Sequence, residues 1–196
     1  MNKKINTYIY YSIASIMLVS AIILIVRVFR NVSRAILKRA KKYVGNREIY
    51  GNSGFENAAF ENKMRSAGWY QGAEWCNFFV KMVVCELAKG RALDFFKKAL
   101  SGSTQQTWRN LQTPSEFHEI LKKPQKGCLI IYRRKSDPAH GHIEIYSGAG
   151  KNGSYSVISG NSNFPTGGQG VVSKLRTATE MNGYDILGYI KIKKLK

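Results

Sequence analysis

The stretch "GHIEIYSGAGKNGSYSVISGN", residues 141–161, decides the fold class of the carboxyl-terminal half of this chain. Its ends contain the runs "HIEIYS" and "YSVIS", in which apolar and polar residues alternate with the period of a half-buried β-strand. The segment "GAGKNG" between them, residues 148–153, is rich in the glycine and asparagine that tight turns favour. The stretch therefore predicts a β-hairpin within an antiparallel sheet.

The register of this hairpin decides which side chains meet across the two strands. If the turn is formed by residues 151–152, His142 lies opposite Asn161. If residues 152–153 form it instead, Asn161 faces Glu144, which shares a face with His142 because side chains alternate along a strand. In either register the Asn161 amide lies within one cross-strand step of the imidazole.

The rest of the chain divides into a helical first part and a stranded second part. The spacing of apolar residues predicts helices over 31–44, around 58–64, and over 76–88, 92–100 and 114–123. Further apolar and alternating runs predict strands over 127–134 and 186–194. Because helices precede strands, we expect an α+β fold with N-terminal helices packed on an antiparallel sheet, formed by residues 28–196 as one domain.

The amino terminus predicts a membrane anchor. A basic tail over 1–6 precedes twenty consecutive uncharged and mostly apolar residues over 7–26. A helix of that length spans about 30 Å, the thickness of the hydrocarbon core of a bilayer. The run continues directly into Arg27 without a small-residue cleavage site, which favours an uncleaved transmembrane helix over 7–27. A helix buried in the domain core is the alternative.

The formal net charge of +19 indicates a polyanionic partner. Nucleic acid, anionic lipid and an acidic cell wall all fit such a charge. No nucleic-acid-binding motif occurs in the sequence, so we predict no nucleic-acid partner. The flanks of the apolar span hold two lysines before it and seven basic residues over 27–42 after it, and a literal count of these charges places the domain in the cytoplasm.

The chain has three cysteines, and their placement distinguishes one of them. An odd number without a C-x-x-C pair argues against a disulfide scaffold, and the histidines lack zinc-finger spacing, so no metal or cofactor is predicted. Cys76 follows "AEW" at the start of a predicted helix, where backbone N–H groups and the helix dipole favour a thiolate. Cys85, in the middle of that helix, and Cys128, in an apolar strand, are predicted to be core residues.

A nucleophilic thiol needs a base, and the base needs an orienting group. His142, which opens the alternating strand, is the best candidate base, and His140 is the alternative. Asn161 is the candidate orienting group because its amide oxygen can hold one ring N–H, the alternative being an ordinary turn asparagine. His118 is predicted to be a surface or packing residue on a helical segment.

The order of these motifs resembles that of the CHAP amidohydrolase/peptidase family and its NlpC-type, papain-like relatives. "AKKYVGNREIYGNSGFEN" looks like the opening helix and loop of bacterial and phage wall hydrolases, and "AEWCNFFVKMVV" is similar to their "WCAAFV" nucleophile helix. "PQKGCLIIYRR" resembles their "P-x-x-GDIVIF" strand, and "AHGHIEIYSG" resembles "GHVGIYVG". The resemblance covers most of residues 35–192.

This resemblance implies a papain-like fold and a Cys-His-polar triad that cleaves amide bonds in peptidoglycan without a cofactor. Carried over by position, Cys76 would be the nucleophile, His142 the base and Asn161 the orienting group. We predict that Trp75 and Glu144 contact substrate; the alternatives are core packing for the tryptophan and, for the carboxylate, a raised imidazole pKa.

Two positions depart from the family pattern. Cys128 stands where the family usually has aspartate, which costs a structural hydrogen bond, and Glu144 stands where a small residue is usual. The departure at Glu144 places a carboxylate near the predicted site.

The sequence thus predicts a membrane-anchored peptidoglycan hydrolase, an amidase or endopeptidase of the endolysin kind, with its catalytic domain on the periplasmic or cell-wall side. That placement opposes the count of flanking charges, on the grounds that the basic helix over 31–44 belongs to the fold. Two alternatives stay open: a catalytically inactive module that binds the wall or a partner, and an antibacterial toxin with the same chemistry.

Overall fold

A computed structural model describes residues 16, 18, 32–177 and 182–196 of the 196-residue chain. The chain divides into two units, Met1–Asn31 and Val32–Lys196, and the second holds the fold described below. No helix within the described residues is long and apolar enough to cross a membrane. The anchor predicted over 7–27 lies outside the described residues except at positions 16 and 18.

The second unit is built on a six-stranded sheet, and the prediction of an α+β fold with an antiparallel sheet is confirmed. The strand order is β3-β8-β4-β5-β6-β7, and every neighbouring pair is antiparallel. The strands are β3 His118–Leu121, β4 Leu129–Arg134, β5 Gly141–Ala149, β6 Tyr155–Asn163, β7 Gln169–Arg176 and β8 Tyr184–Ile192. A separate two-stranded sheet pairs β1 Glu48–Ile49 with β2 Gly54–Phe55.

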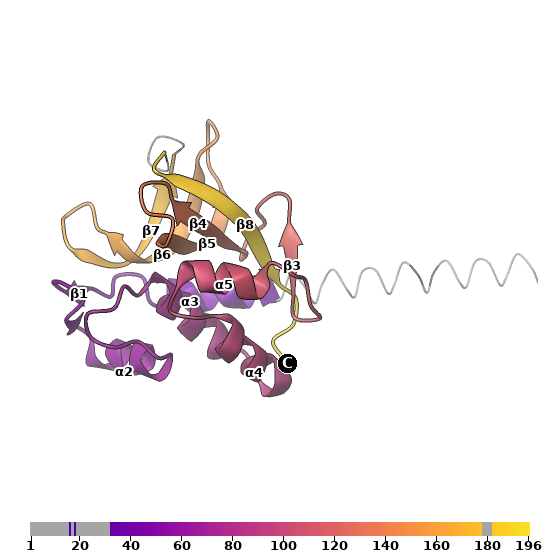
Figure 1. The fold of residues 1–196 in the computed structure, drawn as a ribbon, viewed down its shortest axis with the longest axis horizontal. Coiled ribbons are helices and arrows are strands. Elements are labelled where there is room, and N and C mark those ends of the chain that lie inside the picture. The colour runs from indigo at the N-terminus through magenta and orange to yellow at the C-terminus, as the bar shows by residue number, and fades with distance from the viewer. Residues whose placement is uncertain (1–15, 17, 19–31, 178–181) are drawn as a thin grey trace, which may run out of the picture. The chain divides into compact units, whose positions relative to one another are not determined.

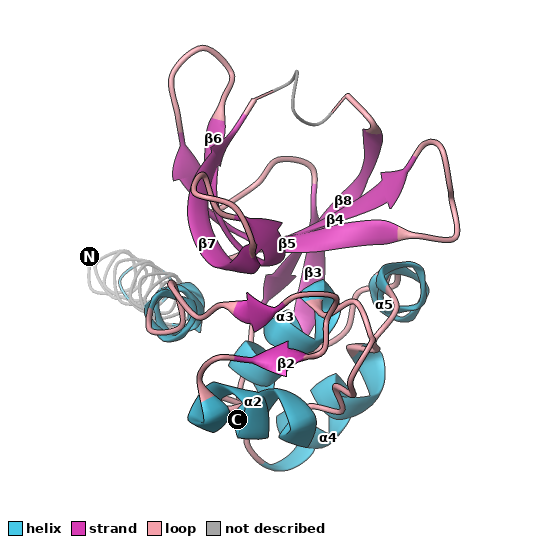
Figure 2. Ribbon diagram, turned by 90° about the vertical axis from the view of Figure 1, so that its left-hand side faces the viewer, coloured by secondary structure: helices cyan, strands magenta, loops and turns pink. Residues whose placement is uncertain are grey.

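Helices cover one face of the large sheet (Figures 1 and 2). A helix over 32–41 is followed by α2 Ala58–Ser66, α3 Cys76–Cys85, α4 Gly90–Ala99 and α5 Thr104–Leu111. Side-chain caps fix two of these starts: Asn57 accepts two N–H groups of α2, and Ser103 accepts the Gln106 N–H of α5. α3 packs against β5 and β6, so the start of this helix lies beside the central hairpin.

The central hairpin, formed by β5 and β6, combines features of both predicted registers. Asn152 and Gly153 occupy the turn, with φ values of 52° and 74°, and the Ser154 N–H donates to the Lys151 carbonyl. Deeper in the strands, however, Ile145 pairs with residue 158, the register expected for a turn at 151–152. A bulge between Tyr146 and Gly148 absorbs the difference.

A close approach between β6 and α3 fixes the position of the hairpin against the helix. A Cβ added to Gly160 would lie 2.8 Å from the ring of Trp75 and 2.8 Å from Cβ of Phe79. Both side chains are fully buried in the main core. Glycine at this position therefore lets the strand lie directly on the first turn of the helix.

The predicted helix over 114–123 is wrong. Residues 118–121 form strand β3, which pairs with β8. The Ser115 hydroxyl accepts the Phe117 N–H and contacts the His118 ring, and this local turn takes the place of a helix start. Strand β7 and the β1–β2 pair were not predicted, because none of them shows a clear alternating pattern next to a turn signal.

Candidate active site

The first residue of α3 is Cys76, as the sequence indicated. Its side chain is 4% exposed, and the preceding residue, Trp75, makes no side-chain cap to the helix. The backbone N–H groups of the first turn therefore have no capping side chain from Trp75. These N–H groups form the positive end of the helix dipole, next to the thiol. The Cys76 sulfur thus lies at the positive end of the helix dipole.

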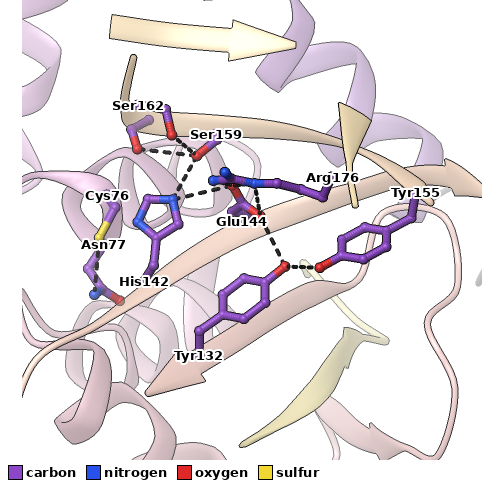
Figure 3. A network of polar contacts seen from close by, with 10 residues as sticks. Cys76, Asn77, Tyr132, His142, Glu144, Tyr155, Ser159, Ser162 and Arg176 are labelled. Carbon is purple, nitrogen blue, oxygen red and sulfur yellow. Dashed lines mark hydrogen bonds and ion pairs between the residues drawn. The ribbon is translucent and has the colours of Figure 1, made fainter. Parts of the chain in front are cut away.

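His142 lies opposite the thiol, on β5. Its Nε2 atom lies 2.8 Å from Oγ of Ser159 on β6 and 3.3 Å from the carboxylate of Glu144. Because a carboxylate only accepts hydrogen bonds, these contacts hold Nε2 as a protonated donor. The other ring nitrogen, Nδ1, points toward Cys76 (Figure 3). The structure therefore brings together the predicted nucleophile and the predicted base.

The imidazole of His142 is held in its charged form. Burial lowers its pKa, but the charge of the Cys76 thiolate, a hydrogen bond to that sulfur and the Glu144 carboxylate raise it to about 10. The side chain is 13% exposed, so water screens these interactions only weakly. A protonated imidazole beside a thiol can act as the general acid of a thiol-dependent mechanism.

A buried ion pair between Glu144 and Arg176 lies next to the imidazole of His142. The fully buried Glu144 accepts hydrogen bonds from the guanidinium of Arg176 and from the hydroxyl of Tyr132, which in turn contacts that of Tyr155 (Figure 3). Burial opposes ionisation of Glu144, yet His142 and Arg176 hold the pKa of the carboxyl well below its usual range. Burial raises the pKa of Tyr132 well above its usual range, and the charge of the Glu144 carboxylate raises it further.

The prediction that the amide oxygen of Asn161 holds a ring N–H of His142 is wrong. That oxygen is buried and has no hydrogen-bond partner among the described residues. Asn161 has a φ of 53° within the bulge between Ser159 and Ser162, and this left-handed conformation turns its side chain away from the register expected for a regular strand. The hydroxyl of Ser159, and not the Asn161 amide, contacts the His142 ring. The hydroxyl of Ser162 lies 2.7 Å from that of Ser159.

Neither predicted substrate contact is available to a substrate. Trp75 is 0% exposed, packs against Phe55 and donates its indole N–H to Glu48. Glu144 is also 0% exposed, and its oxygens are occupied by the groups named above. The alternatives hold instead: the tryptophan is a core residue, and the carboxylate raises the pKa of the imidazole.

Asn77 is a residue of this site that the sequence reasoning missed. It is 2% exposed, and its amide nitrogen lies 2.5 Å from Oγ1 of Thr104 and 3.9 Å from Sγ of Cys76. Its oxygen is buried and has no hydrogen-bond partner in the described part of the chain. The signal was a polar residue directly after the thiol in the apolar run "CNFFV".

Two cavities meet at the thiol and share Glu74, Cys76 and Gly141. The first, of about 250 Å³, is called the basic cavity; the second, of about 510 Å³, is called the aromatic cavity. The basic cavity is further lined by Arg134, His142, Asn161, Ser162, Asn163, Gln169, Lys174, Arg176 and Tyr184. The aromatic cavity is further lined by Tyr70, Ala73, Asn77, Phe78, Gly102, Ser103, Thr104, Ala139 and His140. An extended chain placed across Cys76 would occupy both.

The other cysteines and histidines lie in different surroundings. Burial raises the pKa of Cys85, and it raises the pKa of Cys128 to about 11, so neither thiol is favoured as a nucleophile. His140 is exposed and lies 2.6 Å from a carboxylate oxygen of Asp137. His118 is a buried packing residue, although on a strand, where burial lowers its pKa.

The link between thiol and imidazole gives a direct titration prediction. We expect the His142 ring to titrate near pH 10 in the wild-type chain and at a lower pH in Cys76→Ala, because that variant removes the charge that raises its pKa most. Long-range ¹H–¹⁵N NMR of the imidazoles measures this. Cys85→Ala is the matched control and should leave the titration unchanged; an equal titration in Cys76→Ala would contradict the pairing.

No family model, curated protein or solved structure matches the chain. Within the described residues no group of histidine, cysteine, aspartate and glutamate side chains is arranged to hold a metal ion.

Proposed function

We propose that the chain is a cysteine-dependent amidohydrolase with a papain-like domain of the CHAP/NlpC kind, and that it cleaves an amide bond of the peptide part of peptidoglycan. The observation that carries the proposal is the pairing of Cys76, at the start of α3, with the mostly buried His142, whose far nitrogen is held by Ser159 and Glu144. A thiol, an imidazole next to it and groups that orient the imidazole are the components that such a mechanism requires, and they support the proposal.

The reaction follows from this arrangement. The Cys76 thiolate attacks the amide carbonyl carbon and forms a C–S bond, while N–H groups at the start of α3 stabilise the oxyanion. Nδ1 of His142 gives its proton to the leaving nitrogen, and the C–N bond breaks to release an amine. The neutral imidazole then takes a proton from water, the hydroxide attacks the thioester, and the thiolate leaves as the acid product forms.

The choice of peptidoglycan rests on the sequence resemblance, the charge and the predicted anchor. The net charge of +19 draws the whole chain toward the anionic polymers and lipids of a cell envelope. An anchor over 7–27 would keep it beside the wall, on the periplasmic or cell-wall side. We propose membrane and peptidoglycan as its partners, and an endolysin-like role within that setting.

The test is release of amino groups from purified peptidoglycan by the full-length protein in detergent. We expect new amino groups to appear with time, identified by mass spectrometry of the products, and to be absent after alkylation of the protein with iodoacetamide. Cleavage that survives alkylation would refute a thiol mechanism. No release at all would leave a catalytically inactive binding module as the better description of the domain.

A further inference from the structure

The helix over 32–41, the first of the fold, presents one apolar side and one basic side. Its apolar side holds Ile36 and Ala40, which are fully buried in the main core. The three exposed residues of the helix are all basic, and so is the exposed residue that follows it; these four, Arg34, Lys38, Lys41 and Lys42, are called the cationic face. Successive residues of a helix are rotated by about 100°, which places the four within about 100° of one another around its axis.

None of the four side chains of the cationic face forms an ion pair or a hydrogen bond with another described residue. Residues 1–47 contain no aspartate or glutamate, so the helix supplies no carboxylate of its own. The remaining cation of the helix, Arg39, is bound to Glu86, which also binds Lys63 and the hydroxyl of Tyr43. The cationic face is therefore free to bind an anionic partner.

The cationic face lies close to the predicted anchor along the chain. An anchor over 7–27 leaves only residues 28–31 between the bilayer and the helix. Four residues span at most about 14 Å when fully extended. Because a short tether gives the second of two linked contacts a high effective concentration, the headgroups of that bilayer are the anionic surface most accessible to the face.

The shape of the cationic face suits an array of headgroups. Arg34 and Lys41 are seven residues apart, which corresponds to about 10 Å along the helix axis. The convex side of a helix can lie on a flat surface and bring its charges to several phosphate groups at once. Lysine carries its ammonium group on a flexible stem, so the exact position of each phosphate matters little.

We propose that the cationic face binds the headgroups of anionic phospholipids and holds the domain against the bilayer that contains its anchor. A lysine or arginine close to such a surface strengthens binding about fivefold. The inference rests on the membrane partner proposed above, and it adds the class of lipid and the surface of the domain that meets it.

The test uses the full-length protein in nanodiscs of phosphatidylcholine, with or without phosphatidylglycerol. Reductive methylation with formaldehyde, an uncharged reagent that preserves the charge of lysine, measures the accessibility of each lysine by peptide mass spectrometry. We expect Lys38, Lys41 and Lys42 to react about tenfold more slowly when phosphatidylglycerol is present, as two or more contacts imply. The exposed Lys89 and Lys151, on other elements, should react equally in both nanodiscs.

Variants then assign the protection to the cationic face. Arg34→Gln/Lys38→Gln should bring the ratio of rates at Lys41 and Lys42 close to one. The matched control, Lys89→Gln/Lys151→Gln, also removes two exposed charges and should keep the tenfold ratio. An equal fall in the control would attribute the protection to the overall charge of the chain and overturn the proposal.

Salt and a soluble polyanion test the nature of the contact. In 1 M salt the Debye length falls to about 3 Å, so the protection of the cationic face should disappear. Protection that survives this salt would contradict a contact with charged headgroups. Protection by soluble polyglutamate in phosphatidylcholine nanodiscs, with none from phosphatidylglycerol, would make the face a site for an acidic polymer and overturn the proposal.

The remaining outcomes separate this inference from the proposed function. Equal methylation rates in the two nanodiscs overturn the lipid contact, while cleavage of peptidoglycan and insertion of the anchor still stand. If the full-length protein does not insert into nanodiscs of either composition, the proposed membrane partner fails, and the inference fails with it.

Discussion

Cys76→Ala is expected to lower the rate of amide cleavage at least about 10³-fold, because the other thiol of α3, Cys85, lies at the far end of the helix and cannot form the C–S bond of the acyl-enzyme in its place. The residual rate comes from the oxyanion-binding N–H groups and from substrate binding alone. Release of amino groups from peptidoglycan measures the loss. Cys85→Ala should keep the wild-type rate, since that thiol lies at the other end of the same helix.

The pair of variants distinguishes loss of chemistry from loss of fold. Both remove a single sulfur atom from the same helix and leave a methyl side chain, so each should unfold within a few degrees of the wild-type Tm. Wild-type cleavage by a folded Cys76→Ala protein would mean that another nucleophile acts. Loss of activity in Cys85→Ala with an unchanged Tm would equally contradict the assignment.

The positions of Cys76 and His142 in the fold could be predicted because each residue lies at the boundary of a regular element. A thiol at a helix start and a histidine at the head of an alternating strand are local signals, and the structure places both residues as expected. The orienting group could not be predicted in this way. Asn161 and Ser159 differ by two positions on one strand, and a bulge whose position the sequence does not reveal decides which of them meets the ring.

Burial was the second limit of the sequence reasoning. The sequence correctly indicated that Trp75 and Glu144 lie near the site. It did not show that both side chains are buried, because exposure depends on tertiary packing. Gly160 brings β6 onto the indole, and Arg176 reaches Glu144 from β7, a strand that was not predicted. A carboxylate that looks like a substrate contact thereby becomes a buried support of the imidazole.

Glu144→Gln is expected to destabilise the domain by about 3–5 kcal/mol, because it leaves the guanidinium of Arg176, 12% exposed, beside a neutral amide. Urea unfolding of the full-length protein in detergent at pH 7 measures this loss. The matched control is the double variant Glu144→Gln/Arg176→Met, which removes both charges. The double variant should recover most of the lost stability, and a loss as large as that of the single variant would contradict the ion pair.

The loss of stability caused by Glu144→Gln should depend on pH, because folding lowers the pKa of the Glu144 carboxyl. The carboxyl pKa of Glu144 is lowered in the folded state, so its stabilisation is present above the unfolded value of about 4 and is lost as pH falls toward the folded value. The difference in stability between wild type and Glu144→Gln should therefore shrink below about pH 4. A difference that stays constant down to pH 2 would mean that the charge of Glu144 does not stabilise the fold.

The same substitution also tests whether Glu144 raises the pKa of His142 in addition to stabilising the fold. The pKa of His142 is raised, so its contribution is present below the unfolded value of about 6.5 and is lost as pH rises through about 10. Removing the Glu144 charge lowers that pKa, and the alkaline limb of kcat/KM should move to lower pH in both the single and the double variant. Because the double variant regains stability but not the carboxylate, a wild-type alkaline limb in it would show that Glu144 acts on the fold alone.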